Sequence, residues 1–297
     1  MLTIFTTAKP FIGKIKVNQY NAIRSWKALP VEKEIILFGE GEGYSKAVSD
    51  LNIEWIPEVE TSSQGTPLVN SMFQIARDCG KYQIKMYINS DIVLLSDFPT
   101  ALKSIRFNEY LVVSQRYDLN LNEIIDFNKP DLENELRRMI SNHAKLHPPS
   151  GSDIFCFAGW PWGGIPELVI GRAGYDNELI FHCRNTRVPV IDATGAITLI
   201  HQNHGYAHHK NGRQGVWHGQ EAKTNMEKGK SRGLRFTILE ADYMISGGKI
   251  VRNKRKVELS RKLRARKEIC RSEIGGSIIE YYIRLIGIIN RRILLRY

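Results

Sequence analysis

The segment Tyr87-Ile88-Asn89-Ser90-Asp91-Ile92-Val93-Leu94 places three polar residues inside an otherwise apolar run. Its β-branched and aromatic residues predict a buried strand, and a buried carboxylate has to be hydrogen-bonded, paired with a charge or bound to a cation. Ligands of α/β sheets bind at the carboxyl ends of the strands. We therefore interpret Asp91 as the ligand of a divalent cation that holds a nucleotide diphosphate. The alternative is that Asp91 only caps a turn at the strand end.

The residues around this segment alternate between strand-like and helix-like patterns. Strands are expected over residues 2–7, 34–38, 53–56, 110–114, 188–191 and 197–200. Helices are expected over residues 11–29, 45–51, 68–79 and 175–183, with one or two more within 123–144. For the 68–79 helix, Thr66 is the expected N-cap and Pro67 the first helical residue. Such alternation is typical of βαβ units, so the expected fold class is α/β.

The composition is that of an ordinary globular protein, with 42% hydrophobic and 25% charged residues in a chain of 297. The start, Met1-Leu2-Thr3-Ile4-Phe5, lacks the pattern of a secretory signal, and no apolar run is long enough to cross a bilayer. The four cysteines have no CxxC spacing; they are Cys79, Cys156, Cys183 and Cys270. These features predict a cytoplasmic protein without a disulfide framework or a zinc knuckle.

Positive charge is concentrated at the carboxyl-terminal end of the sequence. The sequence contains 42 Lys and Arg and 31 Asp and Glu. Residues 249–297 hold 15 of the Lys and Arg and 4 of the Asp and Glu, which leaves 27 of each charge in residues 1–248. We therefore expect one domain over residues 1–248 and a basic tail over residues 249–297. From Ser277 to Leu295 the apolar residues recur at helical spacing, which predicts an amphipathic basic helix.

This tail predicts a peripheral position at the inner face of a membrane, since basic residues and an apolar helical face act together on an anionic lipid surface. One alternative is a helix that packs on its own domain or on another subunit. Another is nucleic-acid binding. Nucleic acid is disfavoured because the tail offers an apolar helical face instead of stacking aromatics or a recognisable module.

A histidine cluster follows the apolar residues 197–200. His201-Gln202-Asn203-His204-Gly205-Tyr206-Ala207-His208-His209 holds four histidines in nine residues. Neutral imidazole is the commonest metal ligand among side chains, so His201 or His204 is expected to complete the site begun by Asp91. A carboxylate with imidazole suits Mn or Mg with open positions for phosphate. The alternative is an exposed polar loop.

Two further segments carry candidate side chains. Asp176 lies in a glycine-flanked stretch that opens a helix, where a carboxylate near an acceptor hydroxyl acts as a general base; the alternative is an acid favoured by the helix dipole. Asp153 lies close in sequence to Trp160 and Trp162, which predicts contacts with sugar hydroxyls and sugar rings. The alternative for the tryptophans is a place in the core.

Taken in order, these segments resemble the GT-A glycosyltransferases, and more narrowly the bacterial and plant nucleotide-diphospho-sugar transferases. The likeness spans about residues 1–210. The residues that carry it are Phe5-Thr6-Thr7, Gly65 to Phe73, Tyr87 to Leu94, Val113-Ser114-Gln115-Arg116, Gly151-Ser152-Asp153, Gly171 to Asn177, Ile191-Asp192-Ala193-Thr194 and His201 to His204. In this family the metal motif is usually Asp-x-Asp, whereas here Asn89 stands in place of the first acid, so Asp91 carries the DXD-like role alone.

The resemblance implies a Rossmann-like mixed sheet flanked by helices, with a nucleotide-binding half over about residues 1–115 and an acceptor half over about 116–248. It implies transfer of a sugar from a nucleotide diphosphate sugar to the hydroxyl of a saccharide or lipid-linked acceptor, as in surface polysaccharide or glycolipid assembly. The expected roles are donor binding by Thr6, Thr7, Thr66, Asn70, Asn89, Ser90 and Asp91, Mn or Mg binding by Asp91, His201 and His204, acceptor binding by Asp153, Trp160 and Trp162, and catalysis by Asp176.

Two other functions fit parts of the sequence. A metal-dependent hydrolase would use the His201–His209 cluster, but its acidic partners are few and far apart in the sequence. A nucleic-acid-binding protein would act through the basic tail. Binding of a nucleotide diphosphate together with Mn or Mg distinguishes the transferase from both alternatives.

Overall fold

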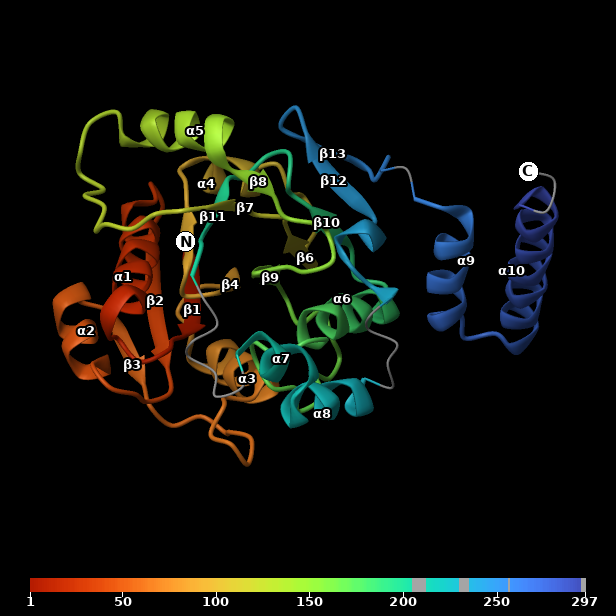
Figure 1. Cartoon of the computed structure of the whole chain (residues 1–297), viewed down its shortest axis with the longest axis horizontal. Coiled ribbons are helices and arrows are strands. Elements are labelled where there is room, and N and C mark those ends of the chain that lie inside the picture. The colour runs from red at the N-terminus through yellow and green to blue at the C-terminus, as the bar shows by residue number, and fades with distance from the viewer. Residues whose placement is uncertain (205–211, 230–234, 256, 295–297) are drawn as a thin grey trace.

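A nine-stranded mixed β-sheet forms the centre of the computed structural model, which describes residues 1–204, 212–229, 235–255 and 257–294 (Figure 1). The strand order is β13-β12-β10-β6-β9-β4-β1-β2-β3. The first strands are β1 (Leu2–Thr7), β2 (Lys33–Phe38), β3 (Glu54–Ile56) and β4 (Lys85–Ile88). Each runs parallel to its neighbour in this group. The amino-terminal half is therefore Rossmann-like.

The other half makes the sheet mixed. Its strands are β6 (Tyr110–Val113), β9 (Ile154–Ala158), β10 (Val190–Asp192), β12 (Tyr243–Ser246) and β13 (Lys249–Arg252). Strand β9 lies antiparallel between β4 and β6, and it joins the two halves. Strands β6, β10 and β12 run parallel to one another, and β13 closes the edge as an antiparallel hairpin partner of β12. The predicted fold class, a mixed sheet flanked by helices, is confirmed.

A second, four-stranded sheet has the order β5-β11-β7-β8, and residues of β5 and β11 share a core with the main sheet and α1. Its strands are β5 (Ile92–Leu94), β11 (Leu199–Gln202), β7 (Tyr117–Leu119) and β8 (Lys145–Leu146). The prediction of one strand over residues 87–94 is wrong, because β4 belongs to the main sheet and β5 to the second. The polar triplet Asn89-Ser90-Asp91 forms the crossing, where the amide of Ile92 donates to the carbonyl of Asn89 at 3.1 Å.

Helices cover both faces of the main sheet. The helices of the described residues are α1 (Gly13–Ala28), α2 (Tyr44–Leu51), α3 (Val69–Cys79), α4 (Asp97–Leu102), α5 (Leu132–His143), α6 (Tyr175–Thr186), α7 (Gly212–His218), α8 (Gln220–Lys228), α9 (Leu259–Glu268) and α10 (Glu273–Leu294), with a 3-10 turn at Ile238–Glu240. Successive residues of β1 enter different cores: Ile4 packs in the core with α1 and α2, and Phe5 packs in the core with α3 and α6. A sheet buried on both faces explains why its strands read as nearly continuous apolar runs.

Some predicted boundaries differ from the structure. Helix α3 begins at Val69 with Leu68 as its N-cap, so the prediction that Thr66 caps it and Pro67 starts it is wrong. Leu68 forms a β-bridge with Val169 and has an extended backbone, so it lies outside the helix. Only α5 forms within residues 123–144, because the first part of that range makes turns.

The predicted tail divides into a strand and two helices. Residues 249–252 form β13 and so pair with the main sheet. Helix α9 places Ala265 in the core next to α6, whereas α10 lies against α9 on the side away from the sheet (Figure 1). Within the part of the chain that the structure describes, no helix combines the length and the apolar character needed to cross a membrane.

Replacement of Phe73 tests the core that supports the site. Phe73 is fully buried on α3, and its ring lies 5.0 Å from that of Phe5 and 5.8 Å from that of Phe157, between centroids. We expect Phe73→Ala to lower the free energy of unfolding by about 3–5 kcal/mol, since it leaves a cavity among aromatic rings. Urea denaturation measures this. The control Ile124→Ala, at a residue that is 55% exposed, should change stability by less than about 0.5 kcal/mol; equal losses in the two variants would contradict the prediction.

Candidate functional site

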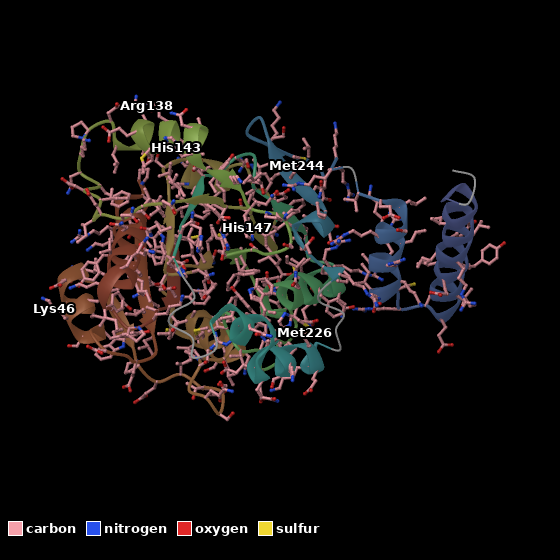
Figure 2. All side chains as sticks on the ribbon, in the orientation of Figure 1. Lys46, Arg138, His143, His147, Met226 and Met244 are labelled. Atoms are coloured by element: carbon pink, nitrogen blue, oxygen red, sulfur yellow. The ribbon has the colours of Figure 1, made fainter. Side chains whose placement is uncertain are left out.

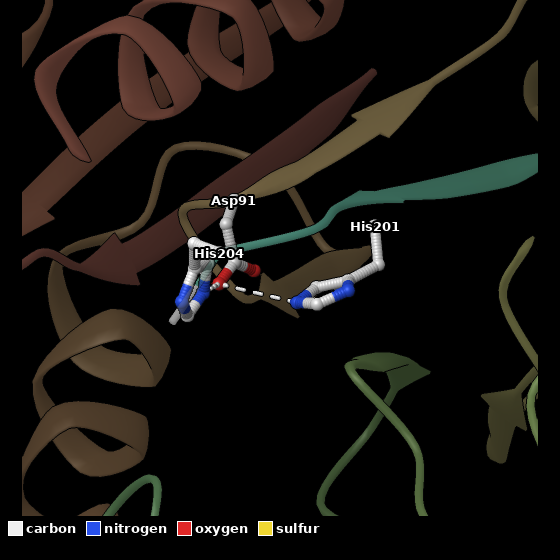
Figure 3. A group of neighbouring side chains, drawn as sticks. All are labelled: Asp91, His201 and His204. Carbon is white, nitrogen blue, oxygen red and sulfur yellow. Dashed lines mark hydrogen bonds and ion pairs between the residues drawn. The ribbon is translucent and has the colours of Figure 1, made fainter. Parts of the chain in front are cut away.

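Asp91, His201 and His204 converge where the two sheets meet (Figure 3). Asp91 ends the crossing from β4 to β5, and the pairing of β11 with β5 places His201 opposite Ile92. The Nε2 atom of His204 lies 2.9 Å from Asp91 Oδ2, and that of His201 lies 3.8 Å from the same oxygen. One ligand atom from each residue falls within 4.8 Å of the others. The structure therefore brings together the three predicted metal ligands.

The Asp91 carboxylate is ionised and incompletely satisfied. Burial raises the pKa of Asp91, but the hydrogen bond with His204 and the nearby charges of His201 and Lys9 outweigh burial. The pKa is thereby held well below its ordinary value. Among the residues that the structure describes, Asp91 Oδ1 is buried and has no hydrogen-bond partner. A buried anionic oxygen without a partner is costly, and a cation between it and the two imidazoles would satisfy it, so these residues fit a metal.

Gln202 fixes the position of Asp91. Its side chain is fully buried, and Nε2 donates to the carbonyl of Asp91 at 3.1 Å and to that of Asn18 at 2.7 Å. Its backbone amide also donates to the Asp91 carbonyl, at 3.3 Å. Asn21 on α1 donates to Gln202 Oε1 at 2.9 Å. Gln202, which lies on β11 between the two predicted metal-ligand histidines in the sequence, thus connects the crossing to α1 through hydrogen bonds.

Asp118 on β7 orients His201. Asp118 Oδ1 lies 3.1 Å from His201 Nδ1, and Oδ2 lies 2.8 Å from Nδ1 of His147, which follows β8 near the centre of the view in Figure 2. An ionised carboxylate only accepts hydrogen bonds, so the Nδ1 atom of each histidine carries the proton in these two contacts. Carboxylate support of this kind is typical of metal-ligating histidines. Asp118 is thus a supporting residue that the sequence analysis missed.

Asn89 and Asp153 are bound to each other and to the protein. Asn89 Nδ2 donates to Asp153 Oδ1 at 2.7 Å, and the hydroxyl of Tyr87 donates to Asn89 Oδ1 at 2.8 Å. Asp153 is 7% exposed and forms an ion pair through Oδ2 with Arg116. Arg116 also donates from Nε to Asp118 Oδ1 at 3.1 Å. The predicted donor role of Asn89 and acceptor role of Asp153 stay predictions.

Asp176 lies in the first turn of α6, as the alternative interpretation of its sequence predicted. Burial raises the pKa of Asp176 to about 6, and the backbone amides of Ser152 and Asn177 only partly offset burial. The amide of Ser152 donates to Asp176 Oδ2 at 3.2 Å. The negative charge of Asp153 also raises this pKa. A carboxylate with a pKa near the working pH is suited to accept a proton. The helix-terminal interpretation of Asp176 is confirmed, and its role as a general base stays a prediction.

The other predicted donor contacts have mixed outcomes. Thr6 is fully buried and donates to the carbonyl of Ile88 at 2.6 Å, so its predicted contact with a nucleotide is wrong. Ser90 donates to Gln19 Oε1 at 3.4 Å beside the cluster. Thr66 Oγ1 accepts from Arg172 Nη2 at 3.3 Å. Thr7, at the half-buried end of β1, stays a predicted donor contact.

The two predicted acceptor tryptophans lie apart from Asp91. Trp162 is 1% exposed, packs in the core and donates from Nε1 to the carbonyl of Leu179 at 2.9 Å, so its predicted acceptor contact is wrong. A large apolar ring gains most from burial, which is the outcome that the alternative interpretation gave. Trp160 and Asn70 line a cavity of about 920 Å³ beside α3, and Asp91 is not among the residues that line it.

Two cations near Asp91 were not singled out in the sequence. Lys9 follows β1; burial lowers its pKa, Asp91 raises it and Arg172 lowers it, so both charged groups act on Lys9. Arg172 donates from Nε to Glu221 Oε2 at 2.7 Å. Sequence signals for both residues were present, since Lys9 lies two residues after a predicted strand end and Arg172 lies in the segment that contains Asp176. His208 and His209, the last two members of the predicted cluster, lie outside the described residues.

No protein-family model and no curated protein matches the sequence. The solved structures that match include the S. aureus TarS fragment 1–349, with 6% identity over 42% of this chain and 38% of that chain and a TM-score of 0.31. Mannosyltransferase PcManGT from Pyrobaculum calidifontis, in complex with GDP-Man and Mn2+, matches at 10% identity over 67% and 56%, with a TM-score of 0.42. Glucosyl-3-phosphoglycerate synthase from Mycobacterium tuberculosis, in complex with Mg2+ and UDP, matches at 14% over 69% and 72%, with a TM-score of 0.39.

These solved structures match this chain only weakly in backbone geometry. The match covers only about two fifths of the TarS fragment and little more than half of the mannosyltransferase. With TM-scores below 0.5, the likeness supports no statement about activity. The activity of this chain has to be argued from the site itself.

Removal of Asp118 tests the cation site without any substrate. We expect Asp118→Ala to raise the dissociation constant for Mn2+ about 10–100-fold, because His201 loses the carboxylate that fixes its ring orientation and protonation. Titration calorimetry with MnCl2 on the folded variant measures the constant. The control is Asp126→Ala, which removes an exposed acid and should leave the constant unchanged. An unaltered constant in Asp118→Ala would show that His201 does not depend on Asp118.

Proposed function

We propose that this protein is a metal-dependent glycosyltransferase that moves a sugar from a nucleotide diphosphate sugar to an acceptor hydroxyl. One observation carries the proposal: an ionised carboxylate with an unpartnered, buried oxygen lies beside two imidazoles at the crossing between two sheets. The proposal rests on that site and on the order of sequence motifs. The acceptor would be a saccharide or a lipid-linked saccharide.

Manganese suits the donor set better than magnesium. Magnesium prefers oxygen ligands in a strict octahedral arrangement, whereas manganese accepts imidazole nitrogen together with carboxylate oxygen. Asp91, His201 and His204 would hold the ion and leave positions open for phosphate oxygens. When bound, the cation would neutralise the charge that grows on the diphosphate as the glycosidic bond breaks.

Lys9 and Arg172 would bind the same diphosphate from the protein side. Lys9 interacts electrostatically with both Asp91 and Arg172, and a diphosphate carries more charge than one divalent ion can balance. Arg172 presents a planar guanidinium suited to phosphate oxygens, and Lys9 supplies a point charge. Arg172 is held in place by Glu221 on α8 and by Thr66. This assigns the predicted donor residue Thr66 a positioning role.

Asp176 would accept the proton of the acceptor hydroxyl. Its burial disfavours the charged form, so the carboxylate gains a proton readily as the hydroxyl attacks. The Asp153 side chain lies within electrostatic reach of Asp176 and hydrogen-bonds Asn89 in the crossing. Through these contacts the proposed acceptor residues Asp176 and Asp153 would be coupled to the segment that carries Asp91. If Asp176 lies opposite the leaving diphosphate, displacement in line gives inversion at the sugar carbon.

Nucleotide binding in the presence of Mn2+ tests the proposed donor class. We expect UDP, GDP, CDP or dTDP to stabilise the protein when Mn2+ is present, by about 2.7 kcal/mol at a ligand concentration of 100 times the dissociation constant. Differential scanning fluorimetry measures the shift. Asp91→Ala should abolish the Mn2+-dependent part, whereas Asp126→Ala should retain it.

Two outcomes would count against the proposed activity. Absence of binding for all four nucleotides, with and without Mn2+, would remove the donor class. Binding followed only by hydrolysis of nucleotide sugars, at a rate that no acceptor alters, would favour the metal-dependent hydrolase.

The role of Asp176 is tested by the pH dependence of transfer. Asp176 has a raised pKa of about 6, and a base acts in its deprotonated form, so kcat should fall as the pH drops below about 6. We expect Asp176→Asn to lower kcat by about 10²- to 10⁴-fold and to remove that acidic limb. The dissociation constant of the donor should not change. Retention of the acidic limb in Asp176→Asn would assign the base to another residue.

A further inference from the structure

Helix α10 carries an apolar stripe that faces solvent. The residues recur three or four positions apart, which places them on one face of a helix. They are Ile274 (76% exposed), Ile278 (53%), Tyr281 (65%), Tyr282 (51%) and Leu285 (38%). Together they form the largest group of neighbours among the exposed large hydrophobic residues of the described chain. Apolar residues gathered on one face of a surface helix mark an interaction site.

The stripe is not needed to hold α10 in place. Helix α10 packs on α9 through its opposite face, where Ile279, Ile283 and Ile286 are half-buried. Figure 1 shows α9 between α10 and the rest of the molecule. Because α9 already covers one apolar face, the outward stripe is a second apolar surface. We define it as the α10 stripe.

The charge around the α10 stripe is strongly positive. Residues 249–297 hold 15 Lys and Arg against 4 Asp and Glu. On α9 the side chains of Lys262, Arg264 and Arg266 are exposed, and on α10 the side chain of Arg284 is 76% exposed. The body of the protein is balanced, with 27 charges of each sign in residues 1–248. The excess charge is therefore confined to the part that carries the stripe.

We propose that α10 lies in the plane of an anionic lipid surface and inserts the α10 stripe into it. Isoleucine and leucine enter the boundary between headgroups and acyl chains, and tyrosine rings prefer headgroup depth. Basic side chains on α9 and α10 attract anionic headgroups over a Debye length of about 8–10 Å. The helix binds on the surface without spanning the bilayer, in agreement with the absence of a spanning helix among the described residues.

The positive charge of residues 249–297 disfavours two other binding partners for the α10 stripe, a second copy of the chain and nucleic acid. A second copy would bring two strongly positive tails face to face, which costs electrostatic energy. Nucleic acid would match the positive charge but would gain nothing from exposed Ile274, Ile278 and Leu285, because phosphate contacts dominate its binding. An anionic lipid surface is complementary to both the charge and the apolar residues.

Docking through α10 would fix the catalytic body at the membrane. Arg261 on α9 forms an ion pair with Glu240 at 2.6 Å, and Arg235 forms another with Glu268. These contacts fasten α9 to the segment that precedes β12, which includes the 3-10 turn at Ile238–Glu240. A body held in this way would reach lipid-linked acceptors, a consequence that rests on the proposed function; the lipid binding itself does not.

Co-sedimentation of the full chain with vesicles tests the inference. The vesicles contain phosphatidylcholine alone or phosphatidylcholine with phosphatidylglycerol. We expect binding to the anionic vesicles only, and weaker binding when NaCl rises from about 0.1 M to about 0.5 M. Ile278→Glu should lower the vesicle partition coefficient at least about tenfold, because it places a charge on the inserted face.

The matched control is Ile124→Glu, since Ile124 is 55% exposed on the body and Ile278 is 53% exposed on α10. The control should bind vesicles as the unaltered chain does. Equal binding of both variants, equal binding to both vesicle types, or no binding would each overturn the inference. Sedimentation velocity without lipid tests for a dimer. A dimer that Ile278→Glu dissociates would assign the α10 stripe to a second copy of the chain. Mn2+ binding, measured on the same samples, reports separately on the Asp91 site.

Discussion

The structure depends on one buried contact between the crossing and β11. Gln202 donates from its side chain and its backbone to the carbonyl of Asp91, while Asn21 and Asn18 of α1 complete its hydrogen bonds. A buried amide gives stability only when its polar atoms are satisfied, and then it fixes one arrangement of the chain. This contact holds the two sheets in register, so that the histidines on either side of Gln202 approach one carboxylate.

A chain of alternating charges surrounds that contact. Asp91 hydrogen-bonds with His204, Asp118 hydrogen-bonds with His201, and Asp153 forms an ion pair with Arg116. The three carboxylates do not hydrogen-bond with one another. Removing one partner from such a buried network leaves an uncompensated charge, which is strongly destabilising. The unpartnered Oδ1 of Asp91 is the exception within this network. Buried polar atoms without a hydrogen-bond partner are most often found at functional sites. We therefore propose the cation site at Asp91 Oδ1.

Prediction from the sequence succeeded where a signal was local. The strands and helices of the first half were found because apolar residues recur with the period of each element. The candidate metal ligands Asp91, His201 and His204 were predicted because they interrupt or follow apolar runs, and the structure places them close together. The site residues missed were Lys9, Asp118, His147 and Arg172. Each is an ordinary polar residue in its own segment, and only the pairing of β7 with β11 brings Asp118 to His201.

The sequence by itself determined the α/β class, the polar break at Asn89 to Asp91 and the basic, amphipathic character of the tail. These follow from composition and periodicity, which act within about ten residues. Tertiary structure decided that the break is a crossing between two sheets, that Trp162 is buried, and that the apolar stripe of α10 faces outward. The physical reason is that burial and hydrogen-bond pairing depend on residues distant in the chain, which only the folded arrangement brings together.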